Sequence, residues 1–472
     1  MNLFSPHIFR EYDIRGVADR DLHDDVVQGI GRSFASLLIE EQIDRGQTPP
    51  RVAVARDCRL SGPRIAKALI SGLQQGGVRV IDVGVGPTPY LYFSVHHLET
   101  EGGIMITGSH NPAGENGFKM MKGQQSFCGP AIRRLRDRTQ QKKKQADRRG
   151  DYTYQNLSEL YVSTVTKEIR CDRTMKVVID AGNGTGGPLA LACMSSLGLD
   201  PIPLYCDMDG RFPHHHPDPT VPSNLHILIE RVIREGARVG IAYDGDADRL
   251  GVIDQDGTII WGDQLLILFA RQVLQKHPGA AIVGEVKCSQ TLYEEIARCG
   301  GRPILWKTGH SLIKNKMKEE QALLAGEMSG HLFFADRYFG YDDALYASLR
   351  LLEILSSDKR SMREMLEDVP RTFTTPELRM ECPEEYKFPL IKLVTKYFKE
   401  KGFEVVDVDG ARIRFPSSSG LAWGLVRASN TGPILVMRFE AASAEERDHW
   451  RAYVENIVEE QRKLLTRTPS AV

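Results

Sequence analysis

"RVAVARDCRLSGPRIAKALI", residues 51–70, decides the fold, because two later stretches repeat its pattern. A short run rich in β-branched residues passes through small and polar residues into a segment compatible with a helix. The same order recurs in "KVVIDAGNGTGGPLALACM", read from Lys176, and in "AAIVGEVKCSQTLYEEIA" at 280–297. Strand, loop and helix form the unit of α/β folds, whose ligands gather at the carboxyl ends of the strands. Three copies predict three related α/β domains rather than one large sheet.

The C-terminal part of the chain has a different pattern. Four stretches read as strands with turns between them, and a final helix over 443–465 begins with a serine cap followed by glutamates. We interpret this part as a smaller α+β domain packed against the third α/β domain. The 472 residues exceed what one core organises. The predicted domains are residues 1–150, 151–256, 257–368 and 369–472.

Composition excludes several classes of protein. A net charge of −1 argues against a general binder of nucleic acid or acidic membranes. The basic segment 133–149 lacks aromatic residues, so we interpret it as a solvated helix near the first domain boundary. The eight cysteines include no C-x-x-C pair, which favours reduced thiols. The start of the chain does not resemble a signal peptide and no apolar run is long enough for a bilayer, so we expect a soluble, cytoplasmic protein.

"YDGDADRLG" at 243–251 places Asp244, Asp246 and Asp248 at alternate positions after an apolar run. Three carboxylates so close repel one another unless a cation neutralises them, and hard oxygen ligands suit Mg²⁺ or Ca²⁺ better than zinc. An EF-hand loop needs glycine and glutamate where this chain has Arg249 and Gln255. A phosphatase with an aspartate nucleophile is a weaker alternative because Asp248 stands where such sites have Thr or Val. A carboxylate-rich turn capping a helix is the structural alternative.

"TGSHNP" at 107–112 places Ser109 and His110 on a predicted tight turn after the apolar run "GGIMI". A serine hydroxyl is a poor nucleophile, but a phosphorylated serine beside a metal is a usable phosphoryl donor. Gly108 would allow close approach of the backbone, and His110 could donate a hydrogen bond to a phosphoryl oxygen. Taken alone, the motif is equally consistent with a turn that has no chemistry.

Two further clusters indicate what is phosphorylated. "GEMSGH" at 326–331 offers a carboxylate, a hydroxyl and an imidazole, which suit vicinal sugar hydroxyls, from Glu327, Ser329 and His331. "RASNTGP" at 427–433 offers an arginine fork, polar side chains and loop amides, which suit a phosphate group; its candidates are Arg427, Ser429, Asn430 and Thr431. Either stretch alone could be a surface turn. Together with the serine and the aspartates, they favour a sugar phosphate as substrate.

These four motifs, in their order along the chain, resemble those of the α-D-phosphohexomutases, most closely the bacterial phosphomannomutase/phosphoglucomutase branch. The resemblance runs from "FREYDIRG" at 9–16 to "SNTGPILVMRFEA" at 429–441, nearly the whole chain. It implies four domains around a central active-site cleft, the first three with related topology, in agreement with the repeated pattern.

The resemblance also implies a role for each candidate residue. Ser109 would be the phosphoserine and a metal ligand, and Asp244, Asp246 and Asp248 would hold Mg²⁺ with Arg249 nearby. Lys119 in "NGFKMM" would be the general acid/base, with His331 as a second candidate. Around the reaction centre would lie Tyr12, Arg15 and His110. Substrate would be read by Lys287, His310, Glu327, Ser329 and His331, and the phosphate that is not transferred by Arg427, Ser429, Asn430 and Thr431.

The implied reaction moves a phosphoryl group reversibly between C1 and C6 of mannose and glucose phosphates. Phospho-Ser109 would give its phosphoryl group to the free hydroxyl, and glucose 1,6-bisphosphate would serve as activator and intermediate. Turning that intermediate without losing it suggests a mobile fourth domain. The partners expected are hexose phosphates, with no nucleic acid and no membrane, and the protein is expected to be a monomer.

Two positions depart from the family pattern. Ala247 stands where glycine is frequent and would be strained if the backbone there needs a positive φ. Gly432 stands where a larger or acidic residue is usual and would loosen the phosphate loop without removing a ligand. The histidines of "FPHHHPDP" at 212–219 are adjacent and flanked by prolines, so we interpret them as structural rather than as a zinc site.

Three other functions remain open at this point. A phosphoglucosamine mutase would use the same chemistry on an amino sugar, although "GEMSGH" and "RASNTGP" favour the mannose/glucose branch. A narrow phosphoglucomutase is the second. The third is a sugar-phosphate-binding protein without catalysis, which a lost serine or aspartate would have favoured.

Overall fold

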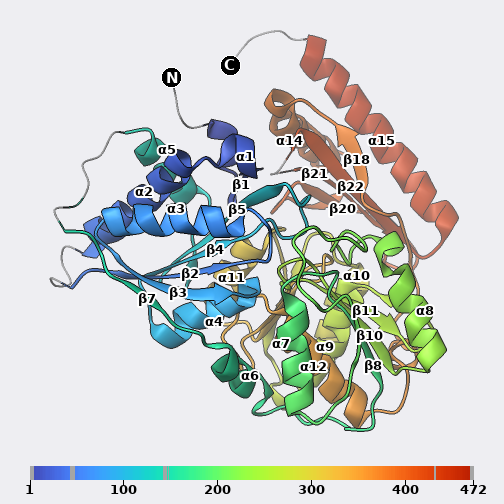
Figure 1. The fold of residues 1–472 in the computed structure, drawn as a ribbon. Helices are drawn as coiled ribbons and strands as arrows, with labels where there is room; N and C mark the ends of the chain where they lie inside the picture. Colours follow the sequence, from blue (N-terminus) through green and yellow to red (C-terminus); the bar gives the residue numbers. More distant parts are fainter. Residues whose placement is uncertain (1–4, 43–47, 142–145, 147, 430–431, 468–472) are drawn as a thin grey trace.

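The computed structural model describes residues 5–42, 48–141, 146, 148–429 and 432–467, and its strands form four separate sheets (Figure 1). We number the domains 1 to 4 after these sheets. Three sheets are mixed, and the last is antiparallel, so the predicted fold class is confirmed.

Domain 1 has the strand order β1-β5-β4-β2-β3-β7, with β6 beside β5. Its helix α3 forms because Ile65, Leu69 and Leu73 recur at helical spacing and are all fully buried. The elements are η1 (Pro6–Ile8), β1 (Ile14–Val17), α1 (Ala18–Asp21), α2 (Asp24–Gln42), β2 (Arg51–Arg56), α3 (Gly62–Gln75), β3 (Arg79–Val85), α4 (Thr88–Leu98), β4 (Gly102–Ile106), β5 (Glu115–Lys122), β6 (Gln125–Ser126), α5 (Pro130–Thr139) and β7 (Tyr152–Tyr154).

Domain 2 follows helix α6 (Ser158–Thr166) and has the strand order β12-β11-β10-β8-β9. Its central strands β8 and β10 are mostly apolar and are buried along their whole length, as expected for strands covered on both faces. The elements are β8 (Val177–Asp180), α7 (Gly186–Ser196), β9 (Ile202–Leu204), η2 (Pro222–Leu225), α8 (His226–Glu235), β10 (Val239–Tyr243), β11 (Leu250–Asp254) and β12 (Ile259–Ile260).

Domain 3 has the strand order β14-β13-β15-β16. Its elements are α9 (Gly262–Lys276), β13 (Ala281–Glu285), α10 (Gln290–Arg298), β14 (Arg302–Trp306), α11 (His310–Glu320), β15 (Leu324–Gly326), β16 (Leu332–Phe334), α12 (Ala344–Ser357) and α13 (Met362–Met365). The exact domain boundaries at 150, 256 and 368 remain a proposal, since β7 and β12, which complete the first two sheets, lie just beyond two of them.

The three mixed sheets share one topology. In each, the first repeat strand (β2, β8 or β13) lies between two parallel partners, the next strand along the chain on one side and the one after it on the other. That third strand (β4, β10 or β15) then turns back into an antiparallel partner. The repeated sequence pattern therefore corresponds to a repeated strand order.

Domains 1 to 3 share a continuous apolar core, whereas domain 4 has its own. The shared core runs from Tyr90 and Phe93 of α4 through Tyr161 of α6 to Phe269 of α9 and Leu351 of α12. The core of domain 4 is a separate cluster. Between domains 3 and 4, one small buried apolar cluster joins Val286 to Trp423 and Leu425.

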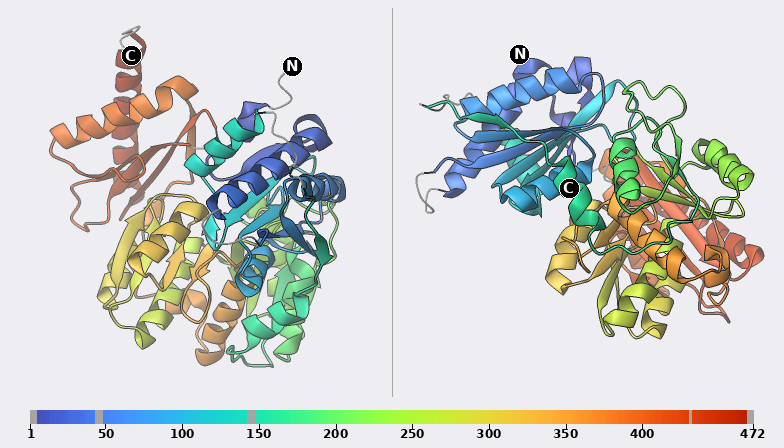
Figure 2. Two further views of the ribbon diagram at one scale, coloured as in Figure 1. Left: turned by 90° about the vertical axis from the view of Figure 1, so that its left-hand side faces the viewer. Right: turned by 60° about the horizontal axis from the view of Figure 1, so that its bottom comes forward.

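Domain 4 is an antiparallel sheet, in the order β17-β22-β21-β20-β19 with β18 beside β22, packed against two helices. The left view of Figure 2 shows it to one side of the other three domains, and Figure 1 shows α15 along its outer side. The predicted serine cap of α15 is present, since Glu446 N donates to Ser443 Oγ at 3.1 Å. The elements are β17 (Phe373–Thr374), β18 (Leu378–Glu381), α14 (Glu384–Glu400), β19 (Glu404–Val406), β20 (Ala411–Arg414), β21 (Trp423–Ala428), β22 (Ile434–Ala441) and α15 (Ala444–Arg467).

Asp343 at the start of α12 gives the interface between α6 and domain 3 a pH dependence. Its buried carboxylate accepts hydrogen bonds from the Tyr161 and Tyr338 hydroxyls and from Tyr346 N. Burial raises the pKa of Asp343 to about 6, and the nearby Asp342 adds to the rise, although these hydrogen bonds oppose it. The folded state thus favours the protonated acid.

We expect the wild type to lose stability as pH rises from about 4 to 6, and we expect the Asp343→Asn variant not to show this loss. A raised folded-state pKa contributes stability that is complete below the unfolded pKa and is lost as pH rises through the folded value. The two-unit difference corresponds to roughly 2–3 kcal/mol. Calorimetric melting from pH 4 to 7 measures it: the Tm of the variant should rise relative to that of the wild type. Parallel curves would contradict the assignment.

Candidate active site

The four motifs lie on four hairpin loops, each between two consecutive strands. The serine loop joins β4 to β5, the aspartate loop joins β10 to β11, and the "GEMSGH" loop joins β15 to β16. These three loops occupy the equivalent position in the three related sheets, after the third strand. The fourth loop joins β21 to β22 in domain 4. The repeated topology therefore places three of the four motifs at corresponding ends of their sheets.

Ser109 is buried and held in a strained conformation. It is 2% exposed and has φ +49°, a left-handed value that costs a residue other than glycine about 1 kcal/mol. Its Oγ donates to Asp244 Oδ2 at 2.8 Å and lies 3.2 Å from His110 Nδ1. The hydroxyl of the first repeat therefore meets the aspartate loop of the second, and the backbone strain fixes its direction.

Arg59, which sequence reasoning did not select, organises the serine loop. Its guanidinium is fully buried and donates to the backbone carbonyls of Ser109, Asn111, Pro112 and Glu115, at 2.6 to 2.9 Å. A Cβ at Gly108 would lie 2.3 Å from Arg59 Cζ. Gly108 is thus required by close approach, as predicted, but the approaching group is this side chain.

We expect Arg59→Met to reduce kcat/KM by about 10²-fold, because the loop loses four hydrogen bonds and Ser109 loses its orientation. Arg59→Lys should recover little, since an ammonium cannot reproduce the fork. Arg64→Met, which removes a half-exposed arginine of the same domain, is the matched control and should stay close to the wild type. Initial rates of the three variants test this, and an active Arg59→Met would contradict it.

The three aspartates converge as the sequence predicts. Asp244, Asp246 and Asp248 are all fully buried, and each offers a carboxylate oxygen within 4.8 Å of the other two. Asp244 Oδ1 also accepts the backbone N–H groups of Asp248 and Arg249. Burial raises the pKa of Asp244 well above its ordinary value, and the other two carboxylates raise it further. Burial would also raise the pKa of Asp246 and Asp248, but neighbouring cations more than offset it and the pKa of both is lowered, so Asp244 is the carboxylate that is short of positive charge.

Lys119 of β5 and two threonines contact this group from domain 1. Lys119 Nζ lies 2.7 Å from Asp246 Oδ2 and also contacts Asp248. Burial alone would lower the pKa of Lys119, but these two carboxylates more than offset it, and the pKa is raised. Thr88 and Thr107 also donate to Asp246 Oδ2. Neither threonine was predicted.

The donor set fits a hard divalent cation. Asp246 Oδ1 is buried and has no hydrogen-bond partner among the residues that the structure describes. The other two carboxylates each offer an oxygen close to Asp246, and Ser109 Oγ contacts Asp244, so all of these are oxygen donors of the kind that Mg²⁺ and Ca²⁺ prefer. The three aspartates lie between β10 and β11, and none of them is the N-cap residue of a helix in the described part of the chain, so the capping alternative does not describe them.

The "GEMSGH" loop of domain 3 contacts the aspartate loop directly. Leu250 N donates to Gly330 O, and His331 Nε2 lies 3.3 Å from Asp248 Oδ1 and 3.4 Å from Arg249 Nε. His331 Nδ1 faces Glu327 Oε2 at 2.6 Å and Ser329 Oγ at 3.0 Å. Burial would lower the pKa of His331, but Asp248 and Glu327 raise it to about 10. The trio is therefore assembled around an imidazolium.

His310 and Tyr12 lie beside this loop. The His310 ring stacks on His331 with 5.6 Å between ring centroids, and its Nδ1 faces Asp342 at 3.3 Å. Tyr12 OH donates to Thr308 O, which joins domain 1 to domain 3. Glu327 Oε1 accepts Gly309 N at 2.6 Å.

Arg15 and His110 lie on the side of domain 1. Arg15 donates to Asp13 and to Thr107 O, the residue two before Ser109. Burial lowers the pKa of His110 well below its ordinary value, and the Arg249 and Arg15 cations lower it further. His110 is thus a neutral imidazole beside the serine hydroxyl.

Lys287 lies between domains 3 and 4. Its Nζ is 3.6 Å from Glu285 and 3.4 Å from Glu377 of domain 4. Burial would lower the pKa of Lys287, but these carboxylates raise it. Lys287 is therefore a buried ammonium held by one carboxylate from each domain.

The fourth loop is described only in part. Arg427 is buried and donates from Nε to Asp409 Oδ2 at 3.1 Å, while Asn430 and Thr431 lie outside the described residues. Lys387 of α14, which was not predicted, donates to the carbonyls of Ser429 and Gly432. A side chain at Gly432 would meet nothing within 4 Å, so the space permits the larger residue usual there.

The backbone at Ala247 and the histidines of the 212–219 segment were both interpreted from the sequence. Ala247 has φ +52°, so the condition for strain at this position is met. His215 faces Asp180 at 3.0 Å, whereas His214 faces Asn183 and stacks on Tyr205. The histidines do not converge on one point, which agrees with a structural role.

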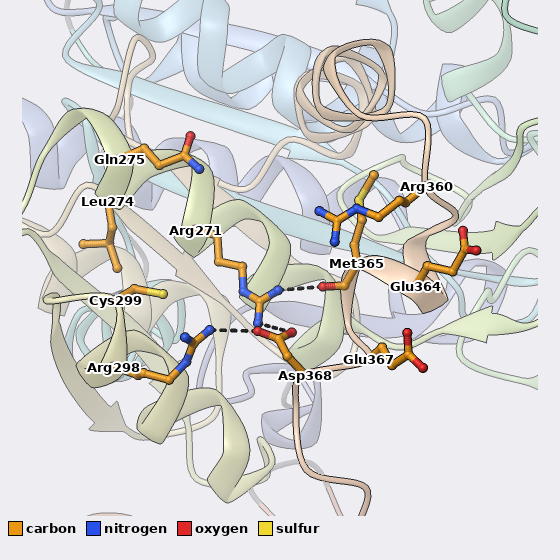
Figure 3. Close-up of a pocket in the computed structure, with 10 residues that line it drawn as sticks. All are labelled: Arg271, Leu274, Gln275, Arg298, Cys299, Arg360, Glu364, Met365, Glu367 and Asp368. Carbon is orange, nitrogen blue, oxygen red and sulfur yellow. Dashed lines mark hydrogen bonds and ion pairs between the residues drawn. The ribbon is translucent and has the colours of Figure 1, made fainter.

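Figure 3 shows a polar cavity of about 670 Å³ away from these loops. Arg271 donates there to Glu295, Met365 O and Asp368, and Arg298 also reaches Asp368. This ion network joins α9 and α10 to the segment that leads into domain 4. Because its charges are paired with one another, we interpret it as structural.

Known protein families match this chain domain by domain. Models of phosphoglucomutase/phosphomannomutase match residues 6–167 (alpha/beta/alpha domain I), 159–257 (domain II), 261–373 (domain III) and 377–457 (C-terminal domain). A phosphomannomutase/phosphoglucomutase of Pseudomonas aeruginosa is 45% identical and covers 95% of both chains. A phosphoglucomutase of Neisseria meningitidis is 43% identical over 98% of both. A solved phosphoglucomutase/phosphomannomutase family protein of Burkholderia thailandensis superposes with a TM-score of 0.88, at 40% identity over 99% of both chains.

Four domain models and relatives of this similarity define the class: the chain belongs to the phosphoglucomutase/phosphomannomutase family of α-D-phosphohexomutases. The predicted family is therefore confirmed. It is a family of isomerases that interconvert hexose 1-phosphates and 6-phosphates, as the sequence motifs indicated.

Proposed function

We propose that this protein is a phosphomannomutase/phosphoglucomutase that works through phospho-Ser109 and a hexose 1,6-bisphosphate. The observation that carries the proposal is the contact of Ser109 Oγ with Asp244 Oδ2, at 2.8 Å, inside a group of three buried aspartates. A serine hydroxyl within a cation site is suited to hold a phosphoryl group whose charge the site neutralises.

In the proposed reaction, the free hydroxyl of a hexose phosphate attacks phospho-Ser109. The phosphorus–oxygen bond to Ser109 Oγ breaks as the bond to the sugar oxygen forms, which gives the 1,6-bisphosphate. After the intermediate turns, Ser109 takes back the other phosphoryl group. Arg249 and Lys119 stabilise the charge of the transferring group, since Lys119 is a buried cation and Arg249 a half-buried one beside the aspartates.

His331, Lys119 and His110 have charge states that suit them to proton transfer. His331 is held as an imidazolium by Glu327 and Asp248, and Lys119 as an ammonium by Asp246 and Asp248. Both are proton donors in this state, so each can protonate a leaving oxygen. His110 is neutral and lies beside Ser109 Oγ, so it can take the proton that the attacking hydroxyl loses, that of the sugar in the first transfer and that of Ser109 in the second.

The residues proposed to hold Mg²⁺ are Ser109, Asp244, Asp246 and Asp248. When bound, Mg²⁺ supplies positive charge that offsets that of the phosphoryl group. A structurally similar N-acetylphosphoglucosamine mutase of Aspergillus fumigatus, 16% identical, has been crystallised with GlcNAc-6P and magnesium. Glucose 1,6-bisphosphate is the proposed activator and intermediate.

Substrate recognition is assigned to domains 3 and 4. Glu327, Ser329, Lys287 and His310 are proposed to read the sugar hydroxyls, and Arg427, Ser429, Asn430 and Thr431 to bind the phosphate that is not transferred. The separate core of domain 4 supports a domain that opens partway for the intermediate to turn. Solution scattering with and without ligand tests this opening, and an unchanged closed form would count against it.

The deciding experiment compares initial rates on mannose 1-phosphate, glucose 1-phosphate and glucosamine 1-phosphate, with Mg²⁺ and a trace of glucose 1,6-bisphosphate. Similar rates on the first two substrates and little on the third are expected. Preference for the amino sugar would keep the mechanism and overturn the substrate, and preference for glucose alone would identify a narrow phosphoglucomutase. Binding without turnover would favour a non-catalytic protein.

The cellular location and the oligomeric state of the protein are also proposed. No helix among the described residues is both long and apolar enough to cross a membrane. We propose a cytoplasmic location and a monomeric state, which fractionation and light scattering would test.

A further inference from the structure

The β19–β20 hairpin of domain 4 reaches the loop of domain 3 that carries Lys287. Arg412 of β20 is 2% exposed, and its Nη1 donates to Val286 O and, at 2.9 Å, to Cys288 O. These carbonyls belong to the residues immediately before and after Lys287. One nitrogen from domain 4 therefore holds the backbone on both sides of Lys287.

The charge of Arg412 has no carboxylate partner within ion-pair distance in the part of the chain that the structure describes. Its guanidinium lies instead 3.7 Å from the centroid of the Trp423 ring and 5.5 Å from that of Tyr293. A buried cation is costly unless dipoles or π faces compensate it, and an apolar side chain would bury the same surface more cheaply. An arginine here is thus better explained by what it positions than by stability.

Asp409, in the turn of the same hairpin, makes a second link. Its Oδ2 accepts hydrogen bonds from Thr308 N and from Arg427 Nε, both at 3.1 Å. Thr308 begins the segment that leads to His310, and Arg427 begins the fourth loop. The turn needs Gly410, whose φ is +88° and whose Cβ would lie 2.4 Å from Val426 O.

The apolar contact between the two domains is small, so polar links set how the loops lie; besides those of Arg412 and Asp409, Lys287 contacts Glu377 and Ser289 donates to Glu440. The buried apolar cluster consists of Val286, Trp423 and Leu425. Such a contact permits rotation, whereas directional hydrogen bonds to Val286 O, Cys288 O and Thr308 N fix the loops in one arrangement.

We propose that the β19–β20 hairpin couples the phosphate-binding loop of domain 4 to the sugar-reading loops of domain 3. Arg412 and Asp409 act as positioning residues: when domain 4 holds the distal phosphate through Arg427, they place Lys287 and the 307–310 segment against the sugar. This inference rests on the proposed function, because it takes Lys287, His310 and Arg427 as substrate-binding residues.

Hydrogen exchange read by mass spectrometry tests the coupling on the full chain, with glucose 6-phosphate as the ligand. In the wild type, the ligand should slow exchange in peptides covering 284–290, 305–311 and 424–429. In Arg412→Met, the protection at 284–290 should be lost while that at 424–429 remains, and KM should rise about tenfold with a smaller change in kcat. Arg412→Lys should restore part of the protection, since it can reach one carbonyl.

Arg414→Met is the matched control, because Arg414 lies on the same strand, is half-exposed and makes no contact with domain 3 among those described. It should behave as the wild type. The proposal is overturned if Arg412→Met keeps ligand-induced protection at 284–290 with an unchanged KM. It is equally overturned if that variant has a lower Tm and loses protection throughout domain 4, since Arg412 would then be merely structural.

A failure of the proposed function and a failure of the proposed coupling give different experimental results. If the wild type turns over no hexose phosphate, the proposed function is wrong. The ligand-free comparison still decides the coupling, because Arg412→Met should exchange faster than Arg414→Met at 284–290 and equally elsewhere. Equal ligand-free exchange at 284–290 in these two variants would overturn it.

Discussion

Replacing Ser109 by Ala is expected to lower kcat for hexose phosphate interconversion by about 10⁴-fold or more, because it removes the hydroxyl that is proposed to carry the phosphoryl group. Affinity for the hexose phosphate should change by less than about threefold, since the residues proposed to bind the substrate lie in domains 3 and 4. Initial rates and calorimetric titration with glucose 6-phosphate measure the two quantities.

The control for this variant is Ser71→Ala, which removes a half-buried hydroxyl on α3. It should retain full activity. Intact-mass spectrometry after incubation with glucose 1,6-bisphosphate gives a second readout: the wild type and Ser71→Ala should gain a phosphoryl group, and Ser109→Ala should not. An active Ser109→Ala variant would show that the assignment of the phosphoserine is wrong.

Replacing Asp244 by Asn is expected to separate stability from activity. Without a cation, the three buried carboxylates repel one another, so neutralising one should leave Tm as high as in the wild type or raise it. Addition of Mg²⁺ should raise Tm of the wild type and leave the variant almost unchanged, because a ligand that binds the native state stabilises it. Turnover should fall by about 10²-fold or more.

Scanning calorimetry with and without 10 mM Mg²⁺ measures both effects. This concentration is about a hundred times the dissociation constant of a weak cation site, roughly 10⁻⁴ M. Asp256→Asn, which removes a half-exposed carboxylate of the following turn, is the control and should keep the Mg²⁺ response. A large fall in Tm for Asp244→Asn without Mg²⁺, or a retained Mg²⁺ shift, would contradict the cation site.

Local sequence order was enough for the aspartates because their spacing is local. Asp244, Asp246 and Asp248 follow a fully buried strand and turn at once into its antiparallel neighbour, so they cannot separate. The serine and "GEMSGH" loops were identifiable for the same reason, since each follows a short buried strand.

The supporting residues were not predicted because their contacts are distant in sequence. Arg59 lies 50 residues from the carbonyl of Ser109 that it holds, and Arg412 lies 126 from that of Val286. An arginine preceded by "DC" or by "GA" has no local signature of such a role. Lys387 of α14 has no local signature either, since the carbonyls to which it donates belong to the loop between β21 and β22.

The sequence by itself determined the class of fold, its three related repeats, and the four loops that carry chemistry. These follow from local pattern: β-branched runs, helix-compatible segments and polar residues at strand ends. Only the tertiary structure decided the charge state of the site and what holds the loops. It alone places Lys119 between two carboxylates, brings Arg59 to the carbonyl of Ser109, and brings Arg412 of domain 4 to the carbonyls on both sides of Lys287. The physical reason is that electrostatic interaction and hydrogen bonding depend on distance in space, which residues far apart in the chain acquire only when the domains pack.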